Sequence, residues 1–184
     1  MLCEAKTILL KDGRKALLRS PELSDAAELA AMIRQIAGET DFILRTREES
    51  TETPEQEAAF IDNMRQSPNA CLLVCEVDGE IAGDCHIQFN RRLKNKHRAS
   101  LGVGILQKYW NLGIGSAMLR ELICLASERP GVVQLELQYI DGNQRALALY
   151  EKMGFRITGV KPNAIRLKDG TLLNEYSMVR EIKR

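Results

Sequence analysis

The chain has 184 residues, a formal net charge of +1 and 45% hydrophobic residues, which suits one domain (1–184) with a substantial core. A charge this close to zero gives no global field for nucleic acid or an anionic membrane, and no apolar run approaches the roughly 20 residues of a membrane span. The start of the chain is not a signal peptide, and the five cysteines form no Cys-x-x-Cys pair. We therefore expect reduced thiols in a cytoplasmic protein without a metal site.

Two hairpins are predicted in the first half of the chain, where Asp-Gly pairs join extended runs. Asp12-Gly13 joins residues 7–10 to residues 16–19, and Asp78-Gly79 joins residues 71–77 to residues 80–89. Aspartate and glycine both tolerate a positive φ, which a tight hairpin turn requires.

Two helices are predicted between these hairpins. Ser24 is expected to cap a helix that ends near Gly38. After a loop without periodicity (41–53), Thr53 and Gln56 have the spacing of a capping box, and Pro54 lies between them at the first helical position.

A basic cluster follows the second hairpin: Arg91, Arg92, Lys94, Lys96, His97 and Arg98. A nucleic-acid interface is one interpretation. No aromatic residues interleave for base stacking, so a solvated hairpin tip is favoured.

The second half of the chain predicts four further strands and two helices. Gly102 and Gly104 lie two apart in a strand over residues 99–106, and therefore share one of its faces. An amphipathic helix over residues 113–128 and an alternating strand from Val133 to Tyr139 come next. The chain then predicts a helix over 143–153 and a last hairpin, 155–167 with 171–179.

The stretch Tyr109 to Ser116 joins a strand to the start of a helix and contains Gly113 and Gly115. Free main-chain N–H groups and the positive end of a helix dipole at such a loop favour phosphate or diphosphate, although short Gly-x-Gly turns without a ligand are common. Met118 stands where a dinucleotide fingerprint needs its third glycine, and no Gly-Lys-Ser or Gly-Lys-Thr occurs. The loop therefore predicts a different phosphate-bearing ligand.

The stretch Asn143 to Phe155 is the second informative one. On a helix, Asn143 and Tyr150 lie within about 20° of each other, with Ala146 on nearly the same side. An amide, a small residue and a phenol then form one stripe. A plain helix cap and a packed tyrosine are the structural alternative.

Together these stretches resemble the GNAT superfamily of N-acetyltransferases. The glycine loop resembles its motif Arg/Gln-x-x-Gly-x-Gly/Ala, and residues 143–155 match Asn-x-x-Ala-x-x-Leu-Tyr-x-x-x-Gly-Phe at every position. Trp110 departs from the Arg or Gln of the first motif, and Lys108 is a nearby alternative source of charge. The Tyr109-Trp110 pair also resembles the branch that acetylates the N-termini of ribosomal proteins.

The resemblance implies an α/β (α+β) fold. We expect one mixed, mostly antiparallel sheet of about six to eight strands and about four flanking helices. A V-shaped splay is expected between the strands near residues 99–106 and 132–139.

The resemblance also implies direct transfer of an acetyl group from acetyl-CoA to a primary amine. The catalytic residues would be Tyr150 as proton donor, the main-chain N–H of Val103 as oxyanion partner, and Glu136 or Glu39 as base. The implied cofactor-binding residues are Val103, Gly104, Ile105, Trp110, Asn111, Leu112, Gly113, Ile114, Gly115, Ser116, Asn143, Ala146 and Tyr150.

A covalent cysteine route and a non-catalytic binding module are the two alternatives to direct transfer. A covalent cysteine route fails because Cys85 and His86 adjoin on a strand and point to opposite faces. A non-catalytic acyl-CoA sensor of the same fold remains open, because Trp110 mildly favours it while Asn143 and Tyr150 argue against it.

The acceptor is expected to be a small-molecule amine or a peptide N-terminus, with neither nucleic acid nor membrane as partner; a homodimer remains open. Five carboxylates near the first inter-helix loop would suit a cationic amine, although charge runs are usually solvated faces. They are Glu48, Glu49, Glu52, Glu55 and Glu57, opposed by Arg45 and Arg47.

Overall fold

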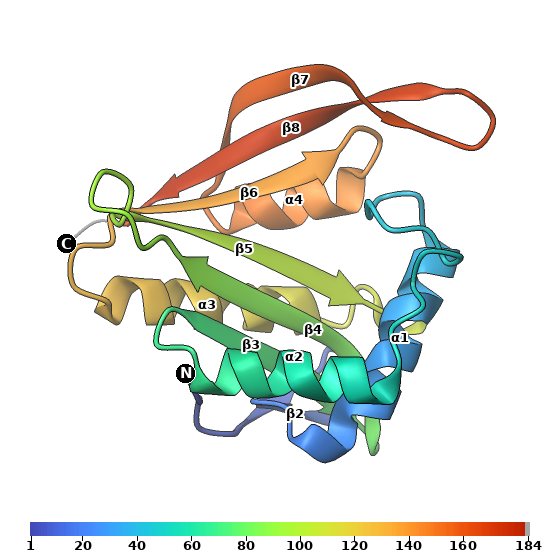
Figure 1. Cartoon of the computed structure of the whole chain (residues 1–184), viewed down its shortest axis with the longest axis vertical. Coiled ribbons are helices and arrows are strands. Elements are labelled where there is room, and N and C mark those ends of the chain that lie inside the picture. Colours follow the sequence, from blue (N-terminus) through green and yellow to red (C-terminus); the bar gives the residue numbers. More distant parts are fainter. Residues whose placement is uncertain (183–184) are drawn as a thin grey trace.

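In the computed structural model, which describes residues 1–182, the chain forms one twisted sheet of eight strands with helices on both faces (Figure 1). The strand order is β1-β2-β3-β4-β5-β6-β8-β7. Neighbouring strands are antiparallel except for β5 (Arg98–Ile105) and β6 (Gln134–Ile140), which run parallel. The mixed, mostly antiparallel sheet predicted from the resemblance is thereby confirmed.

All three predicted hairpins are present. The remaining strands are β1 Lys6–Leu9, β2 Lys15–Arg19, β3 Ala70–Val77, β4 Glu80–Phe89, β7 Arg156–Arg166 and β8 Leu172–Glu181. At the β3–β4 turn both Asp78 (φ 53°) and Gly79 (φ 83°) have positive φ, whereas at the β1–β2 turn only Gly13 does (φ 87°). The expected positive φ at both turn residues is therefore confirmed for Asp78-Gly79, and for Asp12-Gly13 only at the glycine.

Four helices lie within residues 1–182: α1 Ala26–Glu39, α2 Pro54–Gln66, α3 Ile114–Glu128 and α4 Gln144–Lys152. Helices α1 and α2 cover one face of the sheet and α3 and α4 the other (Figure 1). None of these helices combines the length and apolar character that crossing a membrane requires.

The two predicted helix starts had different outcomes. Thr53 accepts a hydrogen bond from the Gln56 N–H, and Gln56 Oε1 accepts one from the Thr53 N–H, so this capping box is confirmed. Ser24 as a cap is wrong, because a 3₁₀ turn (Leu23–Asp25) precedes α1. The capping box of that turn is formed by Glu22 and Asp25.

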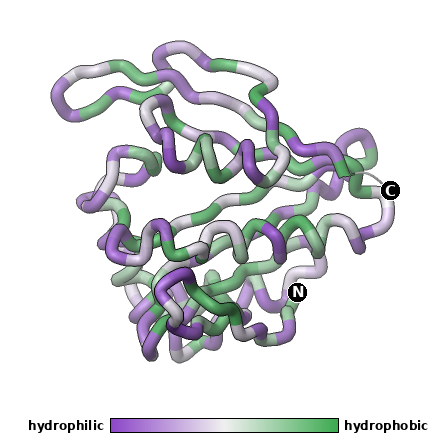
Figure 2. Tube along the Cα trace, turned by 180° about the vertical axis from the view of Figure 1, so that it is seen from behind, coloured by the Kyte–Doolittle hydropathy of each residue, from purple (hydrophilic) through white to green (hydrophobic). Residues whose placement is uncertain are grey.

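The core lies between the central strands and the inner faces of α1 and α3. Side chains of α3 that face the sheet are fully buried, among them Met118, Leu119, Leu122 and Ala126. Figure 2 shows the apolar residues concentrated in the central strands and in α3, while many of the outer turns are hydrophilic. Val133, predicted on the buried face of the sixth strand, lies just before β6 and is 42% exposed, so that assignment is wrong.

The strands β5 and β6 pair over only three residues, Arg98–Ser100 with Gln134–Glu136. Beyond this point β5 stays paired with β4 as far as Ile105, and β6 stays paired with β8 as far as Ile140. The two strands therefore part and leave a V-shaped gap in the sheet, which Figure 1 shows. The predicted splay is confirmed.

A close backbone approach holds β4 against β5 beside this gap. A Cβ atom added to Gly83 would fall against the Gly104 carbonyl oxygen and 3.0 Å from the Ile105 Cα, both of which belong to a central strand. Gly159, in the outer strand β7, has no atom within 4 Å of such a Cβ.

We predict that Gly83→Ala lowers the free energy of unfolding by about 1–3 kcal/mol, because overpacked backbone has to move. For a chain of this length this corresponds to a fall in Tm of roughly 2–4 °C per kcal/mol, measurable by calorimetry. The control Gly159→Ala should leave Tm unchanged or slightly raised. Equal effects of the two substitutions would contradict the close approach.

Candidate active site

The loop between β5 and α3 leads directly into the start of a helix. Gly113 (φ 98°) is the N-cap of α3, and Asn111 (φ 64°) is also in the left-handed region. The Gly113 carbonyl accepts a hydrogen bond from the Ala117 N–H at 3.1 Å, which is the first bond of the helix. The preceding N–H groups of Ile114, Gly115 and Ser116 have no partner inside the helix. The loop thus provides donors and a positive helix end for an anion.

The turn between β1 and β2 is hydrogen-bonded to this loop. The Lys11 N–H donates to the Leu112 carbonyl at 3.0 Å, and Lys11 is the side chain nearest to Gly113. A segment more than 100 residues away in sequence therefore holds the loop in place.

Glycine is required at the two loop positions for different structural reasons. The positive φ of Gly113 needs a residue without a side chain. Gly115 is buried, and a Cβ there would lie 2.9 Å from Leu149 Cδ2. Its absent side chain therefore allows α3 to pack against α4.

Trp110 and Lys108 differ in where they point. The Trp110 Nε1–H donates to the Ile105 carbonyl at 2.8 Å, which holds the indole at the end of β5. Lys108 is paired with Glu80 at 2.6 Å, and the Tyr109 hydroxyl also donates to Glu80. Lys108, the suggested nearby source of charge, therefore shares its charge with Glu80.

Helix α4 forms the other side of the gap. Asn143 Oδ1 accepts from the Ala146 N–H at 3.1 Å, so Asn143 is a helix cap. Tyr150 is only 7% exposed, its ring packs edge-on against Phe155, and burial raises the pKa of its hydroxyl to about 12. The phenol consequently stays protonated at neutral pH and keeps a proton to donate.

The two carboxylates predicted as bases are both engaged. Glu136 Oε1 accepts from Arg98 at 2.9 Å and from the Gln134 side chain at 2.7 Å. Glu39 accepts from the Gln107 N–H at 2.7 Å and from the Gln35 side chain at 2.8 Å. Glu39 thereby ties the end of α1 to the turn after β5.

A third carboxylate was missed by the sequence reasoning. Asp84 lies in β4 directly opposite Gly104, and a Cβ on Gly104 would be 3.0 Å from Asp84 Oδ1. Glu57 of α2 is 5% exposed, and its Oε1 has no hydrogen-bond partner in the part of the chain that the structure describes. Burial first, and the charge of Glu57 second, raise the pKa of Asp84 to about 7.

The sequence contains a signal for Asp84 but none for Glu57. Asp84 is a charge flanked by the buried residues Ala82 and Cys85 in the middle of β4, which is costly unless the site uses it. No comparable signal marks Glu57, because its partner in space lies on another element.

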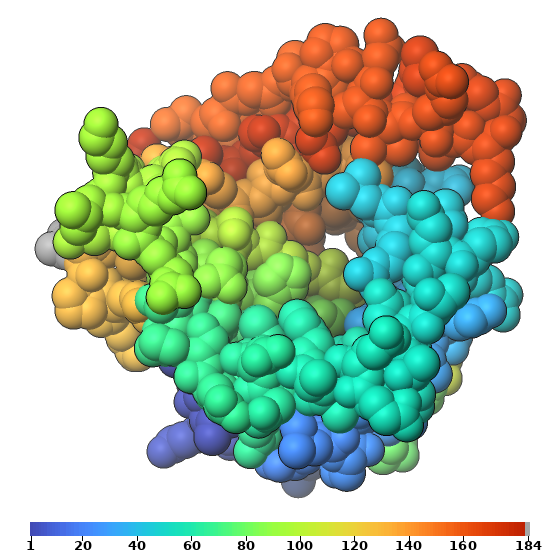
Figure 3. Space-filling view, in the orientation of Figure 1, coloured from blue at the N-terminus to red at the C-terminus, as the bar shows by residue number. Residues whose placement is uncertain are grey.

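The acceptor side of the gap is bordered by the segment between α1 and α2 and by the β7–β8 hairpin. Glu48 pairs with Lys168 of that hairpin at 2.8 Å, and Arg45 pairs with Glu52 at 2.5 Å. Figure 3 shows an opening through the molecule bordered by this segment, by β5 and by the β6–α4 region. Of the five predicted rim carboxylates, Glu57 turns inward and is not part of the rim.

A groove of about 620 Å³, lined by both polar and apolar side chains, lies where β5 and β6 are still paired. Its lining includes Arg98, Ser100, Glu136, Gln138, Thr158 and Ser177. The groove continues the gap toward β8 and β7, so a molecule in it can reach the point where β5 and β6 part.

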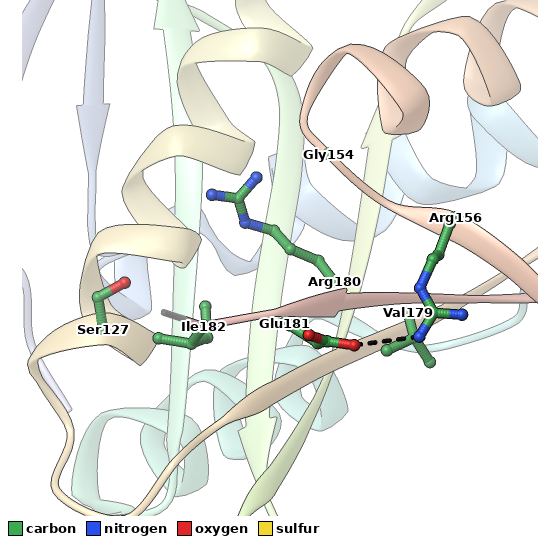
Figure 4. A pocket seen from close by; sticks show the side chains of 7 residues that line it. All are labelled: Ser127, Gly154, Arg156, Val179, Arg180, Glu181 and Ile182. Carbon is green, nitrogen blue, oxygen red and sulfur yellow. Dashed lines mark hydrogen bonds and ion pairs between the residues drawn. The ribbon is translucent and has the colours of Figure 1, made fainter. Parts of the chain in front are cut away.

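A second hollow, of about 490 Å³, lies near the ends of α3 and α4 (Figure 4). Arg180 extends from β8 toward the end of α4 and donates to the Met153 carbonyl, while Arg156 pairs with Glu181 at 3.1 Å. Neither the glycine loop nor Tyr150 lines this hollow. It is therefore separate from the candidate active site.

The alternatives that rely on cysteine or metal find no support in residues 1–182. All five cysteines are free thiols, Cys85 is fully buried and its neighbour His86 is exposed on the other face. No group of three potential metal ligands occurs among the described residues.

Comparison with known proteins identifies the class. Residues 32–155 match the acetyltransferase (GNAT) family, and the chain belongs to that family, whose members are acetyl-CoA-dependent acyltransferases. Among curated relatives, it is similar to the L-amino acid N-acetyltransferase AaaT of Escherichia coli, with 29% identity over 65% of this chain and 73% of the relative. It is also similar to the N-alpha-acetyltransferase RimI of Mycobacterium tuberculosis, with 37% identity over 43% of this chain and 46% of that protein.

Solved structures agree with this family. A GNAT-family acetyltransferase from Streptococcus pneumoniae superimposes with a TM-score of 0.85 at 32% identity, covering 91% of this chain and 99% of the other. The protein yncA of Salmonella typhimurium, solved with its cofactor acetyl-CoA, has the same fold, with a TM-score of 0.78 at 18% identity over 92% of this chain and 95% of the other.

Proposed function

We propose that the protein transfers an acetyl group from acetyl-CoA to the primary amine of an amino acid or of a peptide N-terminus. The observation that carries the proposal is the unpaired inner edge of β5, which leads into the free N–H groups of the α3 N-terminus. An extended amide-bearing chain that ends in phosphates matches such a strand edge followed by a helix N-terminus.

The described residues fit acetyl-CoA, which supplies the acyl group as an activated thioester. Val103 and Ile105 lie beyond the part of β5 that pairs with β6, whereas the Gly104 carbonyl between them points toward Gly83 of β4. The Ile105 carbonyl is bonded to Trp110 Nε1, so the main chain of Val103 and the Ile105 N–H are the groups left on the gap side. The N–H groups of Ile114 to Ser116 are placed for the diphosphate. Asn143 and Ala146 border the other side, where α4 begins.

Tyr150 is the proposed proton donor to the departing thiolate. Its burial favours the neutral phenol, which is the form that can give up a proton. The main-chain N–H of Val103 is the proposed oxyanion partner, at the place where β5 no longer pairs with β6.

Asp84 is the proposed proton acceptor, ahead of Glu136. A base works best when its pKa is near the working pH, and that of Asp84 is raised to about 7. Glu136, by contrast, is held in an ion pair with Arg98 at 2.9 Å. Asp84 also lies opposite Gly104, next to the proposed oxyanion partner Val103.

The proposed class of acceptor is based on the groove beside the paired part of β5 and β6 and on the names of the relatives. Arg98, Glu136 and several amide and hydroxyl side chains give the groove donors and acceptors of both charges. Such a lining suits an acceptor with its own amine and carboxyl or peptide groups. The named relatives are an L-amino acid N-acetyltransferase and an N-alpha-acetyltransferase, which supports the same choice.

A panel of amines tests this function. Purified protein is mixed with acetyl-CoA and with amino acids, polyamines or N-terminal peptides, and free thiol release is followed together with the mass of the acceptor. Acetylation of an amino acid or a peptide N-terminus is the expected result. Binding of acetyl-CoA without turnover on any amine would instead favour an acyl-CoA sensor.

We predict that Tyr150→Phe lowers kcat by about 10²-fold or more, the usual lower range for a lost general acid. The Kd for acetyl-CoA should change little, because the ring and its packing against Phe155 are kept. Steady-state kinetics and calorimetry measure the two quantities separately. An unchanged kcat would remove Tyr150 from this role.

We predict that kcat/KM of the native enzyme falls as the pH drops below about 7, because Asp84 is then protonated and cannot accept a proton. The variant Asp84→Asn should lose this limb and most of its activity at neutral pH. Glu136→Gln serves as the matched control and should keep the native profile. If Glu136→Gln lost the fall in kcat/KM at low pH while Asp84→Asn kept it, Glu136 and not Asp84 would be the proton acceptor.

A further inference from the structure

Arg145 lies in the first turn of α4 and reaches across to the glycine loop. Its guanidinium carbon is 3.6 Å from the centroid of the Trp110 ring. Helix α4 follows β6, and Trp110 follows β5, so this contact joins the two sides of the gap in the sheet. It places a positive charge beside the loop that leads to α3.

Trp110 is held firmly enough to orient this charge. Its Nε1–H is bonded to the Ile105 carbonyl at 2.8 Å, so the indole is anchored at its edge and offers a face to Arg145. A guanidinium that lies over a ring uses its flat face for this contact. Its N–H groups lie in the guanidinium plane and remain directed outward.

The charge of Arg145 is not neutralised by a neighbour. Within residues 1–182 Arg145 takes part in no ion pair and no side-chain hydrogen bond, and it is exposed. Lys108, the other cation beside Trp110 in sequence, is by contrast paired with Glu80. Arg145 is therefore an unpaired cation beside this loop, and among the described residues Lys11, whose Cγ lies 3.9 Å from a Cβ built on Gly113, is a second one.

We propose that Arg145 binds a phosphate group of the acyl donor, and that Trp110 is the positioning residue that aims its guanidinium. The inference rests on the proposed function. The loop position that carries Arg or Gln in the family motif is apolar here, and the positive charge arrives instead from α4. A guanidinium can bind two phosphate oxygens at once, which adds to the N–H groups of Ile114 to Ser116.

Two groups of the donor share this chemistry, the diphosphate and the 3′-phosphate of the ribose. They are distinguished by comparing acetyl-CoA with its 3′-dephospho form. If Arg145 binds the 3′-phosphate, the variant Arg145→Ala binds the two donors equally. If it binds the diphosphate, the variant loses the same factor in affinity for both.

The sequence contains one tryptophan, so the fluorescence of Trp110 reports on this site without any turnover. Arg145→Ala should weaken acetyl-CoA binding by roughly tenfold or more, the usual scale of a lost charge-assisted hydrogen bond. KM for acetyl-CoA should rise with kcat nearly unchanged. Arg145→Lys should restore part of the affinity, and the loss should shrink at high salt.

Lys152→Ala, in the last turn of the same helix, is the matched control and should bind like the native protein. Native affinity of Arg145→Ala for both donors would overturn the proposal. So would a loss that Arg145→Lys does not restore and that accompanies a lower Tm, because that pattern belongs to a purely structural contact. If acetyl-CoA changes neither the fluorescence nor the Tm of the native protein, the proposed function fails and not this inference alone.

Discussion

The parting of β5 from β6 organises the rest of the molecule. Each strand keeps a partner on its outer side, β4 for one and β8 for the other, so the sheet can open in its middle without leaving either strand unsupported. The cost is a stretch of main chain whose hydrogen-bonding groups face a gap, and buried groups of this kind are stable only when something pairs with them. An amide-bearing ligand does so, and the glycine loop and α4 lie at the two sides of the same gap because each directly follows one of the two strands. The proposed site for the acyl donor thus exists because β5 and β6 pair over only part of their length.

Burial has opposite consequences for the two groups proposed to move protons. For Tyr150 it strengthens a state that the phenol already prefers at neutral pH, so the residue becomes a steadier donor. For Asp84 it opposes ionisation, and the neighbouring Glu57 adds a like charge, so the carboxyl is brought into the range where it exchanges protons near neutrality. The groups occupy opposite sides of the divergence, one on α4 and one on β4. One physical effect, exclusion of water, therefore prepares both an acid and a base.

The neighbourhood of the glycine loop shows how charge is distributed over separate elements. The loop itself offers neutral N–H groups, Trp110 offers a ring face, and the nearest lysine in sequence is neutralised by Glu80. Unpaired positive charge beside the loop comes from Arg145, some 35 positions further along the chain, and from Lys11 of the β1–β2 turn. Glu48 and Lys168 join the α1–α2 segment to the β7–β8 hairpin in a similar way across the acceptor side. Exposed pairs of this kind contribute little stability, and this one identifies two segments that border the opening.

The sequence by itself determined what depends on local chemistry. The Asp-Gly turns, the Thr53–Gln56 capping box, Asn143 as a cap and the amphipathic face of α3 all follow from residues within a few positions of one another, and two motifs together were enough to indicate the family. Where local patterns competed, local reasoning failed: Ser24 looked like a cap although Glu22 and Asp25 form the box. Only the tertiary structure decided that Gly115 packs against Leu149, that Lys108 pairs with Glu80, that the charge of Glu57 acts on Asp84, and that Arg145 covers Trp110. These contacts join elements far apart in the chain, and their energies depend on burial and distance, which no periodicity or spacing encodes.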